Sequence, residues 1–430
     1  MRQIIKSVKL YRIIVSYDIM KINRNVMILA VSILLVSPFV NSCKKEDHAP
    51  TYAYYVSKQF VVEYTSVYLK SMIDIFSGAL PEIAGLKPLI NSDIKVYKII
   101  YNTTINGNPI EASGLIIVPV TPGNYPVLSF QNGTNTVNAS SPSESPLDYN
   151  YQLVELVASM GYIAVFADYP GFGESARIVH PYLIKEPTVR SLIDLLYTAK
   201  EMVSQEFPGL TLNNDYYLLG YSQGGWATLA LHKALERDFN SDFNLRGSTC
   251  GAGPYNIEQL LESMVDKPAY PMPVYLAYIV NAYSAYNQFT NPVSDIFNEP
   301  YASRLSTLFT GSLTSAQINS QLTTSINDLI TPDFLSGFNT SAKFSSVITA
   351  LNNNSIEAWH TNKSLLLVHG GNDTTVDPIS TATMYSSMIQ AGTSPDICKK
   401  VIVPGVDHGD GLIPCMIQGI MFLNNLKNSK

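Results

Sequence analysis

The chain has 430 residues, of which 46% are hydrophobic and 14% charged, and its formal net charge is −6 with a pI near 5.6. This length and composition are typical of a globular protein with one large domain that carries an insertion. The acidic balance repels phosphate backbones, which argues against nucleic acid as a partner.

An apolar run of 15 residues, 26–40, lies near the start of the chain, and Lys21 and Arg24 precede it. A membrane-spanning helix needs about 20 apolar residues. We therefore expect residues 1–42 to be a secretory signal peptide, with a short membrane anchor as the alternative. The residues before Met20 do not fit a signal peptide, so we hypothesise that Met20 is the true start.

The apolar run leads to Val40-Asn41-Ser42-Cys43, which resembles a bacterial lipobox, although Asn41 is atypical. This pattern predicts an exported protein that is anchored to a bacterial membrane through a lipid on Cys43. Residues 43–54 would form the tether. Its charged start resembles surface-export signals of lipoproteins in the Bacteroides group, which makes the outer membrane or cell surface a candidate location. A solvated linker is the other interpretation.

Three cysteines remain beyond Cys43, namely Cys250, Cys398 and Cys415. Export permits disulfides, and Cys398 and Cys415 bracket His408. The two residues could therefore form a disulfide that braces the loop, or they could remain free thiols. No cysteine spacing suits a zinc site, and we expect neither a metal nor a cofactor.

The first predicted element is an amphipathic helix over 55–76, packed on the outside of the main domain. A hairpin with its turn at Asn106-Gly107 follows. The predicted strands are 94–103, 110–119, 126–131, 162–168, 216–220, 245–253, 365–370 and 400–405, and the later helices are 147–161, 187–207, 223–237, 379–391 and 412–426.

This alternation predicts an α/β fold with a mainly parallel sheet, flanked by helices on both faces and with antiparallel strands at one edge. Residues 255–361 interrupt it with a stretch rich in Asn, Ser, Tyr and Pro. We interpret this stretch as a helical cap or lid insertion. The catalytic domain would then comprise residues 55–254 and 362–430.

Residues 220–225 read GYSQGG and fit the G-x-S-x-G pattern of a nucleophile elbow, between a predicted strand and a predicted helix. The turn is so tight that side chains beside the serine would clash, so Gly220 and Gly224 flank Ser222. The alternative interpretation of these residues is a Gly-rich loop without a catalytic role. The strand–helix context favours Ser222 as a nucleophile.

A serine nucleophile needs a base and a group that orients the base. His408 follows the last predicted strand on a Gly-flanked loop, from which it could reach the elbow. Asp373 and Asp377 compete to orient it. Asp373 is favoured because it lies closer to its strand end, whereas Asp377 precedes Pro378 and would cap the next helix.

The oxyanion of a tetrahedral intermediate needs backbone N–H donors. One should come from Gln223, directly after the nucleophile. The other should come from the loop at 131–134, where the N–H of Thr134 is the best candidate. A simple turn built on Asn132-Gly133 is the alternative for this loop.

The elbow, DYPGFGES at 168–175, HGGNDTTVD at 369–377 and VDHG at 406–409 resemble the α/β-hydrolase superfamily. Within it, the chain is similar to secreted lipases and esterases with an inserted cap, over roughly residues 92–428. Relatives often read His-Gly in the oxyanion loop, where this chain has Asn132, a change that leaves the backbone donor in place. The resemblance implies a structural role for Asp168.

These patterns predict a secreted serine hydrolase of carboxylic esters, of lipase or esterase type, acting through an acyl-enzyme on a small-molecule or lipid ester. A serine peptidase of short peptides and a non-catalytic surface-binding lipoprotein are the alternatives. A group of cap side chains could cover the elbow or simply pack the cap onto the core. These residues are Tyr270, Met272, Tyr275, Tyr278, Tyr283, Tyr286 and Phe289.

Overall fold

The computed structural model of the protein describes residues 53–78 and 80–429. The predicted signal peptide, the start at Met20, the lipidated Cys43 and all but the end of the tether lie outside the described residues. In the described part of the chain, none of the helices combines the length and the apolar composition that crossing a bilayer requires.

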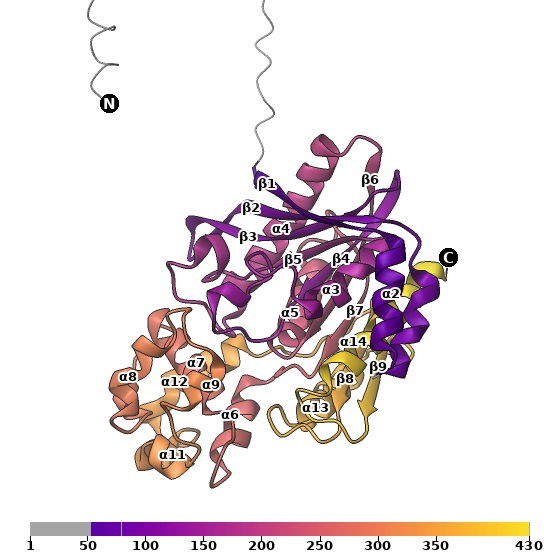
Figure 1. The fold of residues 1–430 in the computed structure, drawn as a ribbon. Coiled ribbons are helices and arrows are strands. Elements are labelled where there is room, and N and C mark those ends of the chain that lie inside the picture. The colour runs from indigo at the N-terminus through magenta and orange to yellow at the C-terminus, as the bar shows by residue number, and fades with distance from the viewer. Residues whose placement is uncertain (1–52, 79, 430) are drawn as a thin grey trace, which may run out of the picture. The chain divides into compact units, whose positions relative to one another are not determined.

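A sheet of nine strands runs through the described chain in the order β1-β2-β3-β5-β4-β6-β7-β8-β9 (Figure 1). The strands are β1 (Tyr55–Tyr64), β2 (Ile94–Ile105), β3 (Asn108–Pro119), β4 (Gly123–Gln131), β5 (Ile163–Ala167), β6 (Leu210–Tyr221), β7 (Asn244–Gly251), β8 (Ser364–Gly370) and β9 (Cys398–Val403). All neighbours from β5 to β9 in this order pair in parallel, whereas β1, β2 and β3 pair antiparallel. The mainly parallel sheet with an antiparallel edge is therefore confirmed.

The predicted hairpin joins β2 to β3, and its turn residues Asn106 and Gly107 have φ values of 50° and 76°. Positive φ at both central residues is what a two-residue hairpin turn of type I′ requires. The register then runs without interruption from Ile105 opposite Asn108 to Ile94 opposite Pro119.

The predicted helix over 55–76 is wrong in its first half. Residues 55–64 form β1, which pairs with β2 at the edge of the sheet, and only Ser66–Phe76 form a helix, α2. Thr65 separates the two, because its side chain accepts a hydrogen bond from the N–H of Tyr68 and caps α2. The segment YVSKQFVVEY is rich in β-branched and aromatic residues, so the available ladder with β2 outweighs a helical spacing that is only approximate.

The start of β1 is fastened to α4 (Lys185–Glu206), a long helix beneath the sheet. The N–H groups of Ala53, Tyr54 and Tyr55 all donate to the carboxylate of Glu201, over 3.1, 2.9 and 2.8 Å. Lys58 also pairs with Glu206 at the end of the same helix. The point at which the chain enters the domain is thus held by a charged cluster.

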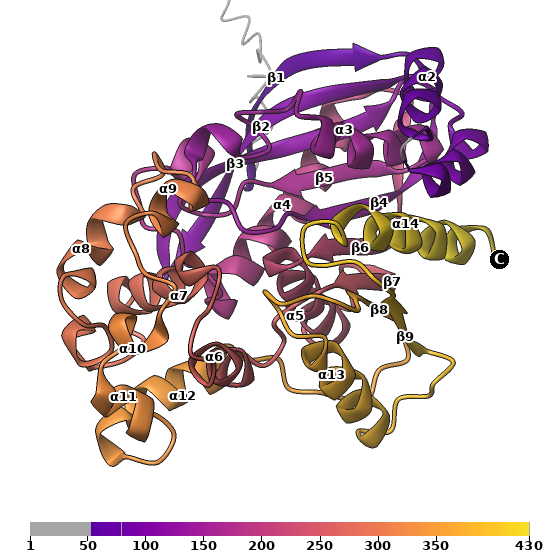
Figure 2. The same cartoon turned by 60° about the horizontal axis from the view of Figure 1, so that its bottom comes forward.

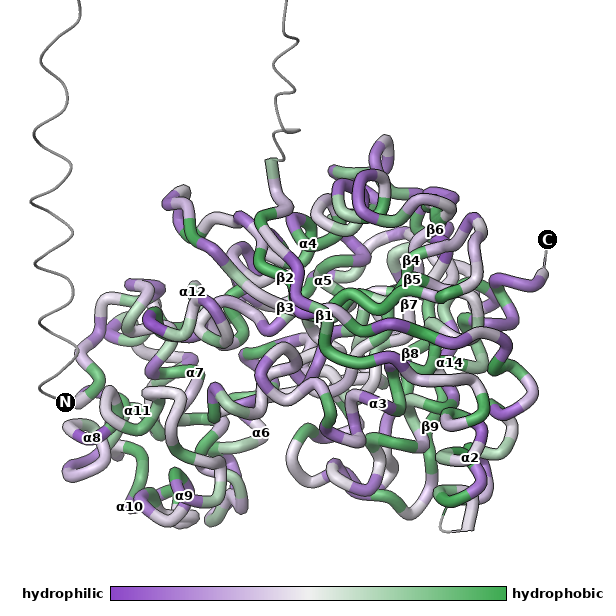
Figure 3. The backbone as a smooth tube through the Cα atoms, turned by 45° about the horizontal axis from the view of Figure 1, so that its top comes forward, coloured by the Kyte–Doolittle hydropathy of each residue, from purple (hydrophilic) through white to green (hydrophobic). Residues whose placement is uncertain are grey.

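Helices cover both faces of the sheet, and the strands between them are buried on both sides. In β5, Ile163 and Val165 belong to one hydrophobic core, and Ala164 and Phe166 belong to the other. The first core lies under α4, α5 (Gln223–Arg237) and α13 (Ile379–Gln390), and the second lies under α2, α3 (Tyr149–Glu155), the 3₁₀ helix η1 (Pro81–Leu89) and α14 (Leu412–Asn428). Figure 2 shows the layers, and Figure 3 shows the hydrophobic residues of the interior strands.

The chain between β7 and β8 is helical and is grouped beside one end of the sheet in Figures 1 and 2. Its helices are α6 (Ile257–Val265), α7 (Pro273–Ala285), α8 (Tyr301–Leu308), α9 (Ser315–Asn319), α10 (Ile326–Leu329), α11 (Pro332–Gly337) and α12 (Ser345–Asn354). An aromatic stack joins it to the main domain, because Tyr278 on α7 lies 4.3 Å from the ring centres of both Tyr182 and Phe309.

Candidate functional site

Ser222 occupies the sharp turn between the end of β6 and the start of α5, with φ 58° and ψ −124°. A positive φ is strained for a residue with a side chain, and such strain is typical of functional turns. The turn persists because its flanks are compact: a Cβ on Gly220 would lie 2.3 Å from the carbonyl oxygen of Gly224. The N–H of Ser222 donates to Gly251 over 2.8 Å, which ties the turn to β7.

His408 lies in the loop between β9 and α14, and its ring faces Ser222. The Nε2 atom of His408 is 2.9 Å from the Oγ atom of Ser222. The hydroxyl of Tyr221 donates to the carbonyl oxygen of His408 over 2.8 Å, and the two rings lie 5.3 Å apart. The residue before the serine therefore holds the backbone of the histidine loop.

Asp373 lies in the loop after β8, and its Oδ2 atom is 2.6 Å from the Nδ1 atom of His408. Its Oδ1 atom accepts from the N–H groups of Thr375 and Val376, each over 2.9 Å. The structure thus brings Ser222, His408 and Asp373 into one hydrogen-bonded chain.

A second histidine also holds Asp373. The buried ring of His369 donates from Nε2 to Oδ2 of Asp373 over 3.1 Å, and its Nδ1 atom lies 2.8 Å from the hydroxyl of Thr381. Burial alone would raise the pKa of Asp373, but the hydrogen bonds from His369 and His408 outweigh it and hold that pKa well below its usual range. Asp373 is therefore an anion at neutral pH.

The competing carboxylate Asp377 and the neighbouring Asp407 have other partners. Asp377 accepts from the N–H of Ile379 over 3.0 Å, at the start of α13. Asp407 accepts from the N–H of Asp410 over 2.9 Å within the histidine loop. In the described part of the chain, neither carboxylate makes a hydrogen bond to the ring of His408.

The predicted oxyanion loop follows β4 and lies against the elbow. A Cβ on Gly133 would lie 3.7 Å from the Cβ of Ser222. The side chain of Thr134 pairs with the hydroxyl of Tyr182 over 2.8 Å, and Tyr169 donates to the carbonyl of Asn132 over 3.1 Å. Among residues 53–78 and 80–429, the backbone N–H groups of Thr134 and Gln223 have no hydrogen-bond acceptor, so both remain available to a ligand.

Sequence reasoning left His180 unassigned, although it contacts the elbow. Its Nδ1 atom donates to the carbonyl of Pro170 over 2.7 Å, and its Nε2 atom accepts from the side-chain amide of Gln223 over 2.8 Å. Burial lowers the pKa of His180 to about 4, so the ring is neutral and can accept this bond. A histidine in an irregular loop carries no periodic signal, so the sequence offered no means of finding this contact.

Helices of the insertion at 255–361 help to line a cavity of about 10 Å³ beside Ser222, which is about the space that one water molecule needs. The lining residues are Tyr182, Ser222, Gln223, Pro254, Leu260, Met264, Tyr270, Tyr275, Thr375 and Val376. Tyr270 and Tyr275 therefore reach the site. Tyr278, Tyr283 and Phe289 instead pack in the core shared with the main domain.

The three described cysteines, Cys250, Cys398 and Cys415, are buried free thiols, so the bridge considered between Cys398 and Cys415 is absent. Within residues 53–78 and 80–429, no three His, Cys, Asp or Glu side chains gather in a way that could hold a metal ion.

Solved structures resemble this chain over most of its length. A protein described as a hydrolase from Legionella pneumophila is 23% identical, with a TM-score of 0.78 over 88% of this chain and 99% of that one. The rice cell wall degrading esterase LipA from Xanthomonas oryzae is 23% identical, with a TM-score of 0.73 over 88% and 98%. Candida antarctica lipase A in its closed state is 14% identical, with a TM-score of 0.62 over 88% and 83%.

No protein-family model matches the chain, and a comparison with curated protein sequences finds no match. The structural likeness establishes the fold: the chain has the α/β-hydrolase fold, with a nine-stranded sheet flanked by helices.

Proposed function

We propose that the protein is a serine hydrolase that cleaves carboxylic esters through an acyl-enzyme. The observation that carries this proposal is the chain of two hydrogen bonds, 2.9 Å from Ser222 to His408 and 2.6 Å from His408 to Asp373. Three residues from loops after three different strands have no packing reason to align in this way. Their order along the chain, Ser, Asp, His, is the order that this fold uses.

In the first half of the reaction, Oγ of Ser222 attacks the ester carbonyl carbon while Nε2 of His408 takes the hydroxyl proton. The anionic Asp373 accepts from Nδ1 of His408, fixes its tautomer and stabilises the imidazolium. The carbon–oxygen bond to the alcohol then breaks, and the departing alkoxide receives the proton from Nε2 of His408. The acyl group remains as an ester on Ser222.

The N–H groups of Gln223 and Thr134 would stabilise the negative charge on the carbonyl oxygen. Gln223 is the first residue of α5, so its N–H is one of the groups that a helix start leaves without a partner. Each such donor typically contributes about 10²–10³ in turnover. Tyr182 and Tyr169 would hold the donor loop against the elbow.

In the second half, water replaces the alcohol. Nε2 of His408 takes a proton from the water as its oxygen attacks the acyl carbon, and then returns a proton to Oγ of Ser222 as the acid leaves. The esterase and lipase among the similar structures support an ester as the substrate.

Fluorophosphonate labelling of the folded protein tests the nucleophile. We expect one label on Ser222, no label in Ser222→Ala, and full labelling in Ser204→Ala, which removes an exposed serine of α4. Ser222→Ala should retain the wild-type circular dichroism and Tm. An unlabelled Ser222 in folded protein would favour the non-catalytic surface-binding lipoprotein.

Turnover of nitrophenyl esters and peptide anilides separates the two enzyme classes. We expect ester turnover and little anilide turnover, because amide cleavage also requires protonation of a poor amine leaving group. Comparable kcat/KM on both substrate classes would favour the serine peptidase.

We also propose that the protein is exported and anchored through a lipid on Cys43, on the basis of the lipobox-like residues 40–43. Palmitate labelling in a bacterial host tests this. Label should be incorporated into the wild type and absent from Cys43→Ala, and equal labelling of both would refute the assignment.

A further inference from the structure

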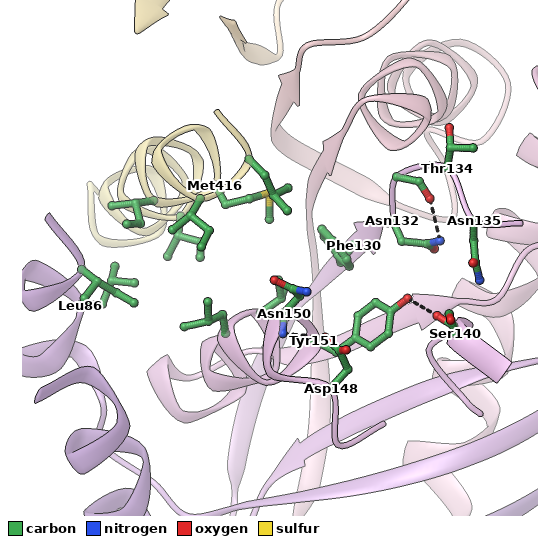
Figure 4. Close-up of a pocket in the computed structure, with 18 residues that line it drawn as sticks. Leu86, Phe130, Asn132, Thr134, Asn135, Ser140, Asp148, Asn150, Tyr151 and Met416 are labelled. Atoms are coloured by element: carbon green, nitrogen blue, oxygen red, sulfur yellow. Dashed lines mark hydrogen bonds between the residues drawn. The ribbon is translucent and has the colours of Figure 1, made fainter. Parts of the chain in front are cut away.

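A larger cavity lies on the other side of the oxyanion loop. It has a volume of about 320 Å³ and lies between α14, α3 and η1 (Figure 4). This volume falls within the range of small-molecule sites. Its lining residues are Ile83, Leu86, Phe130, Asn132, Gly133, Thr134, Asn135, Ser140, Asp148, Asn150, Tyr151, Leu153, Val154, Leu412, Ile413, Met416, Ile417 and Ile420. We refer to it below as the α14 groove.

The walls of the α14 groove are mostly apolar. Ile413 and Met416 project from α14 on one side, and Leu86 projects from η1, as Figure 4 shows for Met416 and Leu86. Tyr151 on α3 closes another side and donates to the carbonyl of Ser140 over 2.8 Å. A groove with such walls suits an alkyl or other apolar group, and its lining has no positive charge to hold a phosphate.

The oxyanion loop is the wall that the α14 groove shares with the site. Gly133 lines the groove, and a Cβ on Gly133 would lie 3.7 Å from the Cβ of Ser222. Leu412 lines it too, only four residues after His408. The groove therefore shares the oxyanion loop with the site and is bounded by the start of the helix that follows the His408 loop.

We propose that the α14 groove binds the alcohol portion of the ester substrate, and that this portion is apolar and longer than the acyl group. The inference rests on the proposed function. His408 must hand its proton to the departing alkoxide, so the alcohol leaves from the His408 side of Ser222, and Leu412 at the start of α14 bounds the groove on the chain that continues from His408. The acyl group then faces the cap, where the cavity beside Ser222 is about 10 Å³.

Two unpartnered polar atoms lie near the groove wall at the oxyanion loop. Within the described residues, the buried Oδ1 of Asn132 and Nδ2 of Asn135 have no hydrogen-bond partner, and both residues line the α14 groove. Their other side-chain atoms are engaged, since Asn132 donates to Gly133 and Asn135 accepts from the N–H of Val137. An acceptor and a donor without partners thus lie just behind the groove wall at the oxyanion loop, and a small shift of either side chain would let it pair with a polar group of the substrate.

Two ester series test the assignment in the wild-type protein: acetates of linear alcohols from ethanol to decanol, and ethyl esters of acids from acetic to decanoic. We expect kcat/KM to rise roughly two- to fourfold for each methylene added to the alcohol until the groove is filled. It should fall as the acyl chain grows. A kcat/KM that does not change with the length of the alcohol, or that rises with the length of the acyl chain, would overturn the proposal.

Ile413→Trp fills the α14 groove from a partly exposed position and should lower the ratio of kcat/KM for octyl over ethyl acetate at least tenfold. Ile413→Asn cannot overpack the wall and should lower the same ratio in the same direction. Ile379→Trp is the matched control, since Ile379 is 49% exposed and does not line the groove. An unchanged ratio in both folded Ile413 variants would contradict the assignment.

Calorimetry of 1-decanol with Ser222→Ala separates this proposal from the proposed function. One molecule should bind per chain, and binding should weaken at least tenfold when Ile413→Trp is added. Binding without any ester turnover in the wild type would retain the groove and refute the hydrolase. Ester turnover without decanol binding would retain the hydrolase and refute the groove.

Discussion

Gly224, in the first turn of α5, lies directly against the backbone of Gln131 at the end of β4. A Cβ added to Gly224 would come within 1.9 Å of the carbonyl oxygen of Gln131. No side-chain rotation relieves such a contact, because the atom it meets is backbone. The distance between the elbow and the strand end that carries the oxyanion loop therefore depends on the absence of a side chain at Gly224.

Gly224→Ala should accordingly damage activity more than stability. We expect a loss of roughly 1–3 kcal/mol in the free energy of unfolding from overpacking, and a fall in kcat of more than about 100-fold because the shifted strand end carries the oxyanion loop. Ester kinetics and denaturant unfolding measure the two effects. Gly85→Ala is the control, since a Cβ there meets nothing within 4 Å; comparable losses in both variants would contradict the argument.

Asp373→Asn should lower kcat by about 10³–10⁴, because an amide can present its N–H₂ to His408 and favour the wrong tautomer. Asp377→Asn should change kcat by less than about threefold, since an asparagine oxygen can still accept from the N–H of Ile379. Ester kinetics on both purified variants make the comparison. Equal losses would show that Asp373 does not orient His408.

Tyr182→Phe should lower kcat several-fold and leave KM nearly unchanged. The substitution removes the hydroxyl that pairs with Thr134 over 2.8 Å, a bond whose net contribution is roughly 1 kcal/mol. Thr134→Val should act similarly, and the double variant should be no worse than either single one. Tyr286→Phe loses a hydroxyl that bonds to Val179 and serves as control; a fully additive double variant would argue against the shared bond.

Glu155→Gln should stabilise the protein at alkaline pH. Glu155 is fully buried, and within the described residues neither carboxylate oxygen has a hydrogen-bond partner. Burial raises its pKa from 4.5 to about 8. Between these values the folded protein keeps a proton that the unfolded chain has released, so this residue makes stability fall as the pH rises toward 8.

The variant should therefore match the wild type near about pH 5 and exceed it by roughly 2–4 kcal/mol near about pH 8. Urea unfolding across this range measures the difference. As a control, Glu82→Gln changes an exposed residue and should leave the pH dependence of the free energy of unfolding unchanged. A constant gap between Glu155→Gln and the wild type at every pH would mean that Glu155 does not titrate as described.

The sequence was sufficient to find functional residues that lie in a short, recognisable motif. Ser222 stands in a motif that glycine geometry enforces, and His408 and Asp373 follow strands with strong apolar runs. Parallel strands end at one edge of the sheet, so these three loops converge without further information. The structure brings together the three side chains that this reasoning selected.

Features built from distant segments could not be predicted in this way. The apolar residues at 55–64 fit the spacing of a helix as well as that of a strand, and only the pairing with β2 makes this segment a strand. The α14 groove has walls from η1, α3, the oxyanion loop and α14, and no window of sequence contains them all. The contact between His180 and Gln223 depends on the path of a loop, which composition does not encode.

The hydrogen bonds from residues 53–55 to Glu201 determine how the molecule would respond to a pulling force at this end. A pull applied at Ala53 is transmitted to α4 and the outermost strand, and four further strands separate β1 from β6, whose end carries Ser222. At about 4.8 Å between neighbouring strands, this distance is roughly 24 Å across the sheet. Immobilising the protein on a bead through this end should thus leave any ester turnover unchanged.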